Sequence, residues 1–186
     1  MEYISIGLIK EPSTEILLNV SHYGHVFQLT GLPAKMWLNA KTGFCSVDTP
    51  QEKRAADWLL RMNLIKVSAG ESTGRYRILT ECNIVCTTEH SKLHLLRKDE
   101  AFLLQWIQQA GIHLTAAELV YLMERQIKPR SELVGTENSQ ALVEAIYTQE
   151  TIFDQVLENL MEQSPHRERA VEALMGLLKK RCIVLI

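Results

Sequence analysis

The chain has 186 residues, of which 46% are hydrophobic and 23% charged, and its formal net charge is −2. This is an ordinary globular composition, and no apolar run approaches the roughly 20 residues that span a bilayer. The first ten residues lack the basic start and apolar stretch of a signal peptide, and four scattered cysteines are too few for a disulfide scaffold. We therefore expect a cytoplasmic protein with reduced thiols and no membrane partner.

Charge is distributed unevenly along the chain. Residues 1–98 carry 12 basic and 9 acidic side chains, a net of +3, whereas residues 99–186 carry 8 and 13, a net of −5. A net of +3 permits a small basic patch for nucleic acid, because phosphate contacts dominate such binding. The acidic half is better suited to a basic peptide or a protein partner.

Strands dominate the first 31 residues. Residues 4–9 form a short apolar, β-branched run, and residues 16–22 and 25–30 flank Tyr23-Gly24, which is typical of a tight turn. The pattern predicts a strand followed by a hairpin. Pro33 suits the first turn of a helix, which we expect over residues 34–40.

A second helix, over residues 50–63, has the clearest start signal. Thr49 is an N-cap, Pro50 occupies the first helical position, and Glu52 completes a capping box. The apolar residues that follow at helical spacing predict one buried stripe, in which we expect Trp58 to be a core residue. They are Ala55, Trp58, Leu59 and Met62.

The segment after this helix resembles a wing. Residues 64–68 read as extended, residues 69–74 as a polar loop bounded by glycines, and residues 75–86 as a returning strand. A helix followed by strand, loop and strand is the pattern of a winged helix.

The second half is mostly helical. Helices are predicted over residues 99–110, from Thr115 to about 126, over residues 137–163, and after Ser164-Pro165, with a final strand over residues 182–186. The long helix 137–163 has an apolar face that could pair two subunits in a homodimer. That face comprises Leu142, Ile146, Phe153, Val156, Leu157 and Leu160.

A short internal similarity links the two halves. The segment 59–65 (LLRMNLI) resembles 177–183 (LLKKRCI), and both read as a helix end that runs into a strand. We therefore expect an α+β protein of two winged-helix-like modules, residues 1–88 and 92–186, the second mostly helical. Whether the modules are true repeats stays open.

Cys82, Cys86, His90 and His94 have metal-ligand chemistry, but their spacing argues against a site. On a strand each four-residue step spans roughly 13 Å, and a hairpin would bring them together only in separate pairs. His22 and His25 bracket a turn without a nearby carboxylate cluster. No nucleophile, phosphate-loop or dinucleotide motif is present. We expect no metal, no cofactor and no enzymatic activity.

A winged-helix transcription regulator is one interpretation. Its DNA contacts would be basic side chains on helix 50–63 and beyond the wing loop, since arginine and lysine read base edges and phosphates. The candidates are Lys53, Arg54, Arg61, Arg75 and Arg77.

The preferred interpretation is peptide binding, and it rests on a resemblance. Three predicted strands, the stretch 29–37 (LTGLPAKMW), Gly43 and the helix end at 59–65 resemble a PqqD-like domain over about the first 67 residues, although one helix of that family is short or missing here. The resemblance implies that a leader peptide from a ribosomal peptide-modification pathway adds as a strand to a sheet edge, beside a groove. Carried over, the peptide-binding residues are Val26, Phe27, Gln28, Trp58 and Arg61.

Overall fold

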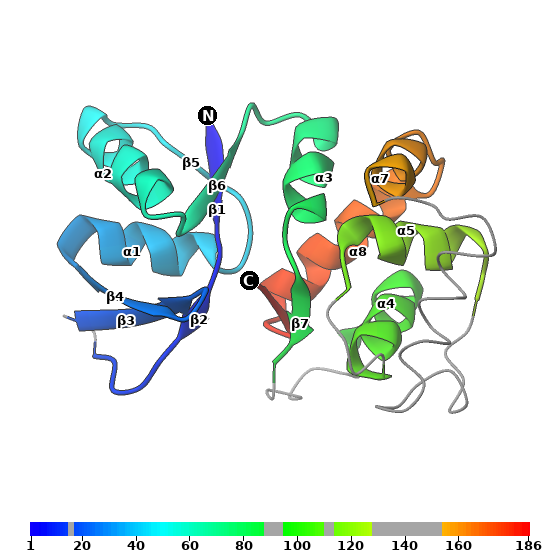
Figure 1. Ribbon diagram of the computed structural model, residues 1–186, viewed down its shortest axis with the longest axis horizontal. Coiled ribbons are helices and arrows are strands. Elements are labelled where there is room, and N and C mark those ends of the chain that lie inside the picture. Colours follow the sequence, from blue (N-terminus) through cyan, green and yellow to red (C-terminus); the bar gives the residue numbers. More distant parts are fainter. Residues whose placement is uncertain (15–16, 88–94, 110–113, 128–153) are drawn as a thin grey trace.

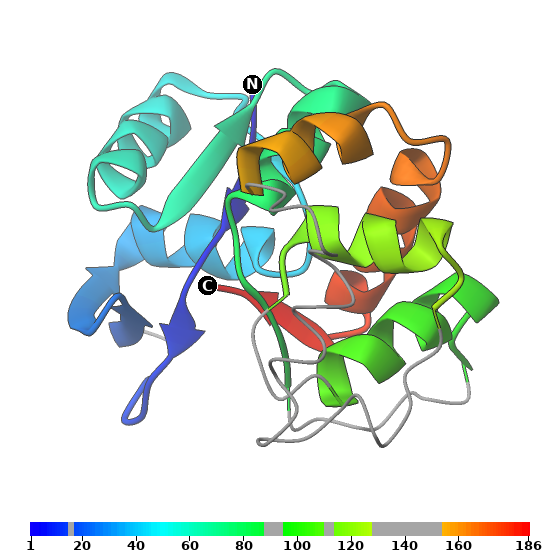
Figure 2. The ribbon, with the colours of Figure 1, turned by 45° about the vertical axis from the view of Figure 1, so that its right-hand side comes forward.

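The computed structural model describes residues 1–14, 17–87, 95–109, 114–127 and 154–186. The fold is mixed α+β, as expected, and its strands form small separate sheets. Two helix-covered halves lie side by side, and the C-terminus ends between them near strand β1 (Figures 1 and 2).

The first half contains two antiparallel sheets. One has the order β5-β1-β6, from Cys45–Ser46, Glu2–Ser5 and Ile65–Ser68. The other has the order β2-β3-β4, from Leu8–Ile9, Leu17–His22 and His25–Thr30. The predicted hairpin is therefore confirmed, and Tyr23 and Gly24 form its turn with φ values of 45° and 79°.

Two helices stack above this hairpin (Figure 1). Helix α1 spans Gly31–Ala40 and helix α2 spans Pro50–Arg61. The capping box of α2 is present as predicted, since Thr49 accepts from the Glu52 N–H and the Glu52 carboxylate accepts from the Thr49 N–H. The helix buries Ala55, Ala56 and Leu59 toward α1.

The predicted wing is wrong at residues 72–80. These residues form helix α3 (Ser72–Thr80), and only Ile84–Cys86 forms a strand, β7. Helix α3 buries Tyr76, Ile78 and Leu79 against helices of the second half, which outweighs the local β propensity. Gly74, read from the sequence as a loop glycine, instead lets α3 approach β6, because a Cβ there would lie 2.7 Å from Ser68 Oγ.

The second half is helical, as predicted. This half comprises helices α4 (Lys98–Gln109), α5 (Ala116–Glu124), α7 (Asp154–Glu162) and α8 (Arg167–Lys179) and a two-stranded sheet of β7 and β8 (Ile183–Leu185). Helix α4 packs against β7 and helix α8 against β8, whereas α7 packs against α5 and α3.

The apolar face of the predicted helix 137–163 is described only in part. Residues 128–153 lie outside the described ranges, and with them Leu142, Ile146 and Phe153. On α7, Leu157 is buried, whereas Val156 and Leu160 are 46% and 54% exposed.

The similarity between segments 59–65 and 177–183 corresponds to the same local structure. Asn63 and Arg181 both adopt positive φ, 53° and 57°. The next N–H donates to the carbonyl five residues back in each case, Leu64 to Leu59 and Cys182 to Leu177, at 2.9 Å. These are Schellman-type helix ends, and strands β6 and β8 begin one residue later.

The halves share a second feature. Trp37 in α1 donates its indole N–H to the carbonyl of Leu64, and Trp106 in α4 donates to the carbonyl of Ile127. Leu64 directly follows Asn63, and Ile127 directly follows Gln126. Asn63 and Gln126 each have a φ of 53° and lie at the end of a capped helix, α2 and α5 respectively. Each tryptophan thus fixes the end of the next helix against its own helix.

The hydrophobic packing joins the halves across β1. Tyr3 belongs to the core of the first half, but Ile4 and Ile6 belong to the larger core of the second. Residues of α3 and β7 also belong to the second core, and β7 pairs with β8. Both α3 and β7 lie within the first expected module, residues 1–88, but they pack against elements of the second, residues 92–186.

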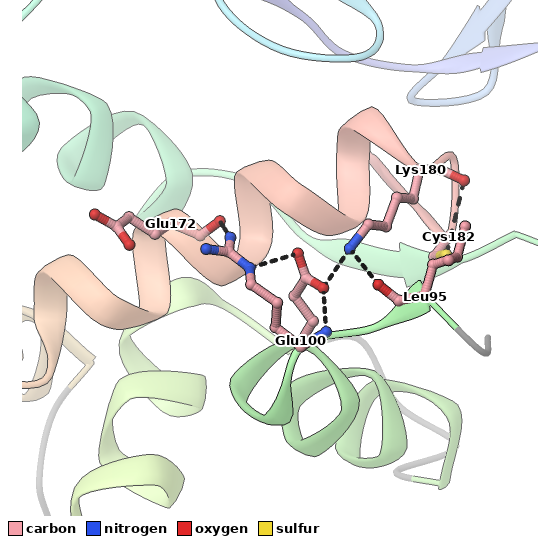
Figure 3. A network of polar contacts seen from close by, with 6 residues as sticks. Leu95, Glu100, Glu172, Lys180 and Cys182 are labelled. Carbon is pink, nitrogen blue, oxygen red and sulfur yellow. Dashed lines mark hydrogen bonds and ion pairs between the residues drawn. The ribbon is translucent and has the colours of Figure 1, made fainter. Parts of the chain in front are cut away.

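A buried carboxylate connects α4 to α8. Glu100 is 1% exposed and forms ion pairs with Arg97 and Lys180 (Figure 3). Lys180 also donates to the carbonyl of Leu95 at 3.0 Å. Burial is the largest influence on the Glu100 pKa and raises it, but the hydrogen bonds from Lys180 and Arg97 together outweigh burial, so the pKa lies below its ordinary value.

Candidate functional site

Strand β4 is an outer strand of its sheet. The strand order β2-β3-β4 leaves one side of β4 without a strand neighbour among the described residues. Of its six residues, only Leu29 is buried. An exposed row of backbone donors and acceptors of this kind can accept an additional strand.

The register of the hairpin shows which backbone groups face outward. His22 and His25 pair across the two-residue turn. From there along the strands, pairs that share hydrogen bonds alternate with pairs that do not, and the latter are Ser21 with Val26 and Asn19 with Gln28. In an antiparallel ladder, alternate residues direct their N–H and C=O groups to the partner strand. Val26 and Gln28 therefore direct theirs to the open side, where the described residues provide no backbone partner.

The side chains of β4 alternate between core and solvent. Leu29 is 1% exposed and Phe27 packs partly against the same core, whereas Val26 is 50% exposed and Gln28 is also exposed. The edge therefore offers an apolar side chain beside open backbone groups.

The other two predicted peptide-binding residues lie elsewhere. Trp58 and Arg61 are on α2, and α1 lies between α2 and the hairpin (Figure 1). The structure therefore brings Val26, Phe27 and Gln28 together but does not place Trp58 and Arg61 beside them. Trp58 is 38% exposed, so the expectation that it is a core residue is wrong.

The predicted DNA-contacting side chains fall on two helices. Lys53, Arg54 and Arg61 are exposed on α2. The other two, on α3, are paired with carboxylates: Arg75 forms two hydrogen bonds to Glu2, at 2.8 and 2.9 Å, and Arg77 pairs with Glu162 at 2.9 Å. Strand β6 lies between the two helices (Figure 1), so the five do not form one continuous cationic row.

The two histidines at the hairpin turn differ. His25 is exposed, whereas His22 is 6% exposed and its ring Nε2 lies 3.3 Å from the side-chain nitrogen of Asn63. Burial, and then the charge of Lys66, lower the pKa of His22. His22 is thus a packed, neutral residue that joins the turn to the end of α2.

The cysteines of the possible metal grouping are buried to different degrees. Burial raises the pKa of Cys82 to about 12 and that of Cys86 to about 11, so both are protonated thiols at neutral pH. His90 and His94 lie outside the described residues. Within the described ranges, no three His, Cys, Asp or Glu side chains are grouped as metal ligands.

Three clefts have no counterpart among the sequence predictions. The described residues line clefts of about 780, 700 and 490 Å³. The first two flank α8 and are lined by mixed, partly ion-paired charges, including Arg77, Glu162 and Glu168. The third lies where the two halves meet, so residues far apart in sequence form it, and no local pattern could have indicated it.

Comparison of the chain with family models, curated proteins and solved structures found no match. Among the described helices, none is both long and apolar enough to cross a membrane.

Proposed function

We propose that this is a non-enzymatic, cytoplasmic recognition protein that binds an extended segment of a peptide or protein partner along the edge of β4. The observation that carries the proposal is the open side of β4, with the outward backbone groups of Val26 and Gln28. Backbone hydrogen bonds would give affinity, and the exposed Val26 and partly buried Phe27 would give selectivity.

The resemblance of the first 67 residues to PqqD-like domains supports a particular partner. In that family the added strand is a leader peptide of a ribosomally made, modified peptide. Of the features that carry the resemblance, the hairpin and the stretch 29–37 form β3, β4 and the first part of α1. Because α1 separates Trp58 and Arg61 from β4, the proposed site comprises Val26, Phe27 and Gln28 alone.

A proline at an outward position tests the strand edge directly. Gln28→Pro removes an outward N–H while leaving the ladder to β3 intact, since proline is tolerated where the N–H of an edge strand faces solvent. Peptides selected from a displayed random library would be measured by calorimetry. We expect Gln28→Pro to weaken binding about tenfold, as befits the loss of one backbone hydrogen bond.

Gln28→Thr is the matched control, because it changes the side chain but keeps the N–H. It should bind within about twofold of the original protein, and hydrogen exchange at the amides of Val26 and Gln28 should slow when peptide is bound. Equal affinities for the proline and threonine variants, or peptide-induced protection confined to α2, would exclude strand addition at β4.

DNA binding is the alternative function, and the exposed cations of α2 are the observation in its favour. Lys53, Arg54 and Arg61 are all exposed on that helix. If it is correct, affinity for a duplex should fall steeply as salt rises, and each of Lys53→Gln, Arg54→Gln and Arg61→Gln should reduce the salt slope by about one. Arg77→Gln, which removes a cation already paired with Glu162, should change the slope less.

A further inference from the structure

The cleft at the junction of the halves is built from four elements that are distant in sequence. Its lining residues come from β2, from the C-terminal end of α1, from the end of β7, and from the segment where α8 passes into β8. Its volume of about 490 Å³ lies within the range, roughly 300–1,000 Å³, of small-ligand sites. It lies apart from the outer side of β4, which faces away from β3 and β2.

The walls of this cleft include apolar side chains that remain in contact with solvent. Ile9 is 36% exposed and Leu38 is 40% exposed, and both line the cleft together with Leu178 and Val184. Leu178 and Val184 are themselves buried, so Ile9 and Leu38 are the two aliphatic side chains that a ligand could cover. Single exposed aliphatic residues are common on protein surfaces, but two that face one concavity with an apolar floor favour an apolar ligand group.

The charges that the described residues bring to the cleft are all of one sign. Among the described residues, its ionisable lining residues are Lys41 and Arg181, and no carboxylate lines it. Lys41 lies over the ring of Trp37, with its Nζ 5.9 Å from the ring centroid. Asn39 and Thr42 add neutral hydrogen-bonding groups to the same wall.

We infer that this cleft binds a carboxylate attached to an aliphatic group. The aliphatic group packs against Ile9 and Leu38, and the carboxylate interacts with Arg181, whose planar guanidinium matches a carboxylate with two parallel donors. Two sources offer this chemistry: a free aliphatic acid, and the C-terminal residue of a peptide that ends in leucine, isoleucine or valine.

The alternative to a ligand-binding role for Arg181 is a purely structural role. It follows the last turn of α8, where a cation stabilises the helix dipole. In that role its replacement would lower the thermal stability of the protein and leave ligand binding unchanged, so the two roles differ in what they predict for a binding experiment.

Four probes test the site by NMR titration of the full chain. They are hexanoate, N-acetyl-alanyl-leucine, and the amide of each, which lacks the negative charge. We expect saturable shifts at the amides of Leu38, Thr42 and Thr87 with at least one acid, and about tenfold weaker binding of the corresponding amide. Binding of hexanoate alone would identify a free acid as the ligand, and binding of the dipeptide acid alone would identify a chain terminus.

Two substitutions complete the test. Arg181→Gln should weaken the acid about tenfold, and Arg181→Lys should restore part of the affinity. Lys179→Gln is the matched control: it removes a cation from the end of the same helix, but Lys179 lines the 700 Å³ cleft instead, so affinity should not change. Failure of both acids to bind, equal affinity for acid and amide, or equal affinity of Arg181→Gln and the original protein would overturn the inference.

Discussion

The side chain of Glu100, on α4, leaves no room for a side chain at position 176 of α8, which is a glycine. A Cβ at position 176 of α8 would lie 3.0 Å from the carboxyl carbon of Glu100 and 3.3 Å from a guanidinium nitrogen of Arg97. The glycine therefore makes room for the buried carboxylate in the interface between α4 and α8. A helix interior normally disfavours glycine, so its presence here reflects packing, not local propensity.

Gly176→Ala should consequently destabilise the protein. Alanine favours the helix by about 1 kcal/mol, but overpacking against Glu100 should cost about 1–3 kcal/mol, so we expect a net loss of up to about 2 kcal/mol in urea unfolding. The double variant with Glu100→Ala should recover most of the loss caused by the added methyl group. If Gly176→Ala lowers stability equally with and without Glu100, the steric explanation fails.

Glu100 should also give the protein a dependence of stability on pH. Its pKa in the folded state lies below the unfolded value, so its contribution is fully present above the unfolded pKa, about 4.3, and is lost as pH falls through the folded pKa. Urea unfolding at several pH values should therefore show a steeper loss of stability below about pH 5 in the original protein than in Glu100→Gln.

Other carboxylates contribute to acid sensitivity in both proteins and do not affect this comparison. Glu52, for example, has a lowered pKa because it accepts hydrogen bonds from the backbone of Asp48 and Thr49. Parallel pH profiles for the original protein and Glu100→Gln would show that the buried ion pairs are not coupled to folding.

At the scale of single elements, the start of α2 is determined locally. Thr49 Oγ1 accepts from the Glu52 N–H at 3.2 Å, and the Glu52 carboxylate accepts from the Thr49 N–H at 2.9 Å. The contacts involve residues only three apart, so the sequence pattern was sufficient to predict them.

Removal of this cap should have a modest and specific cost. Thr49→Ala should lower the free energy of unfolding by about 1 kcal/mol, because one backbone N–H loses its acceptor, whereas Thr49→Ser should be nearly neutral. Urea unfolding measures both changes. A loss of the same size in the serine variant would show that the methyl group of Thr49 matters, and not the cap.

Helix α3 illustrates the limit of local patterns. Its glycine, its hydroxyl residues and the β-branched Ile78 and Thr80 favour a loop and strand, yet burial of Tyr76 and Leu79 against the second half makes it a helix. Only the tertiary environment provides that burial.

Trp58 shows the same limit. It follows the helical spacing of a core residue, but it lies at the border of the buried stripe of α2 and is 38% exposed.

At the scale of the whole molecule, β1 couples the two halves. Its Tyr3 packs in one core and its Ile4 in the other, and Glu2 at its start holds Arg75 of α3 through two hydrogen bonds. A single strand that contributes to both cores should make them unfold together.

Ile4→Ala tests this coupling. Ile4 is fully buried, so its truncation should cost about 2–5 kcal/mol. Native-state hydrogen exchange should show the same loss in the most protected amides of β6, in the first half, and of α4, in the second. A loss confined to α4 would mean that the halves unfold independently.

The sequence alone determined the features that depend on neighbouring residues: the hairpin and its turn, the capped starts of α2 and α5, the helix ends that run into β6 and β8, and the mixed α+β class. These follow from hydrogen bonds and side-chain periodicity within a few residues. The tertiary structure decided that residues 72–80 are helical, that α1 separates Trp58 from β4, and that Leu38 and Arg181 line one cleft. These features depend on contacts between distant segments, and no local pattern specifies which buried surfaces will meet.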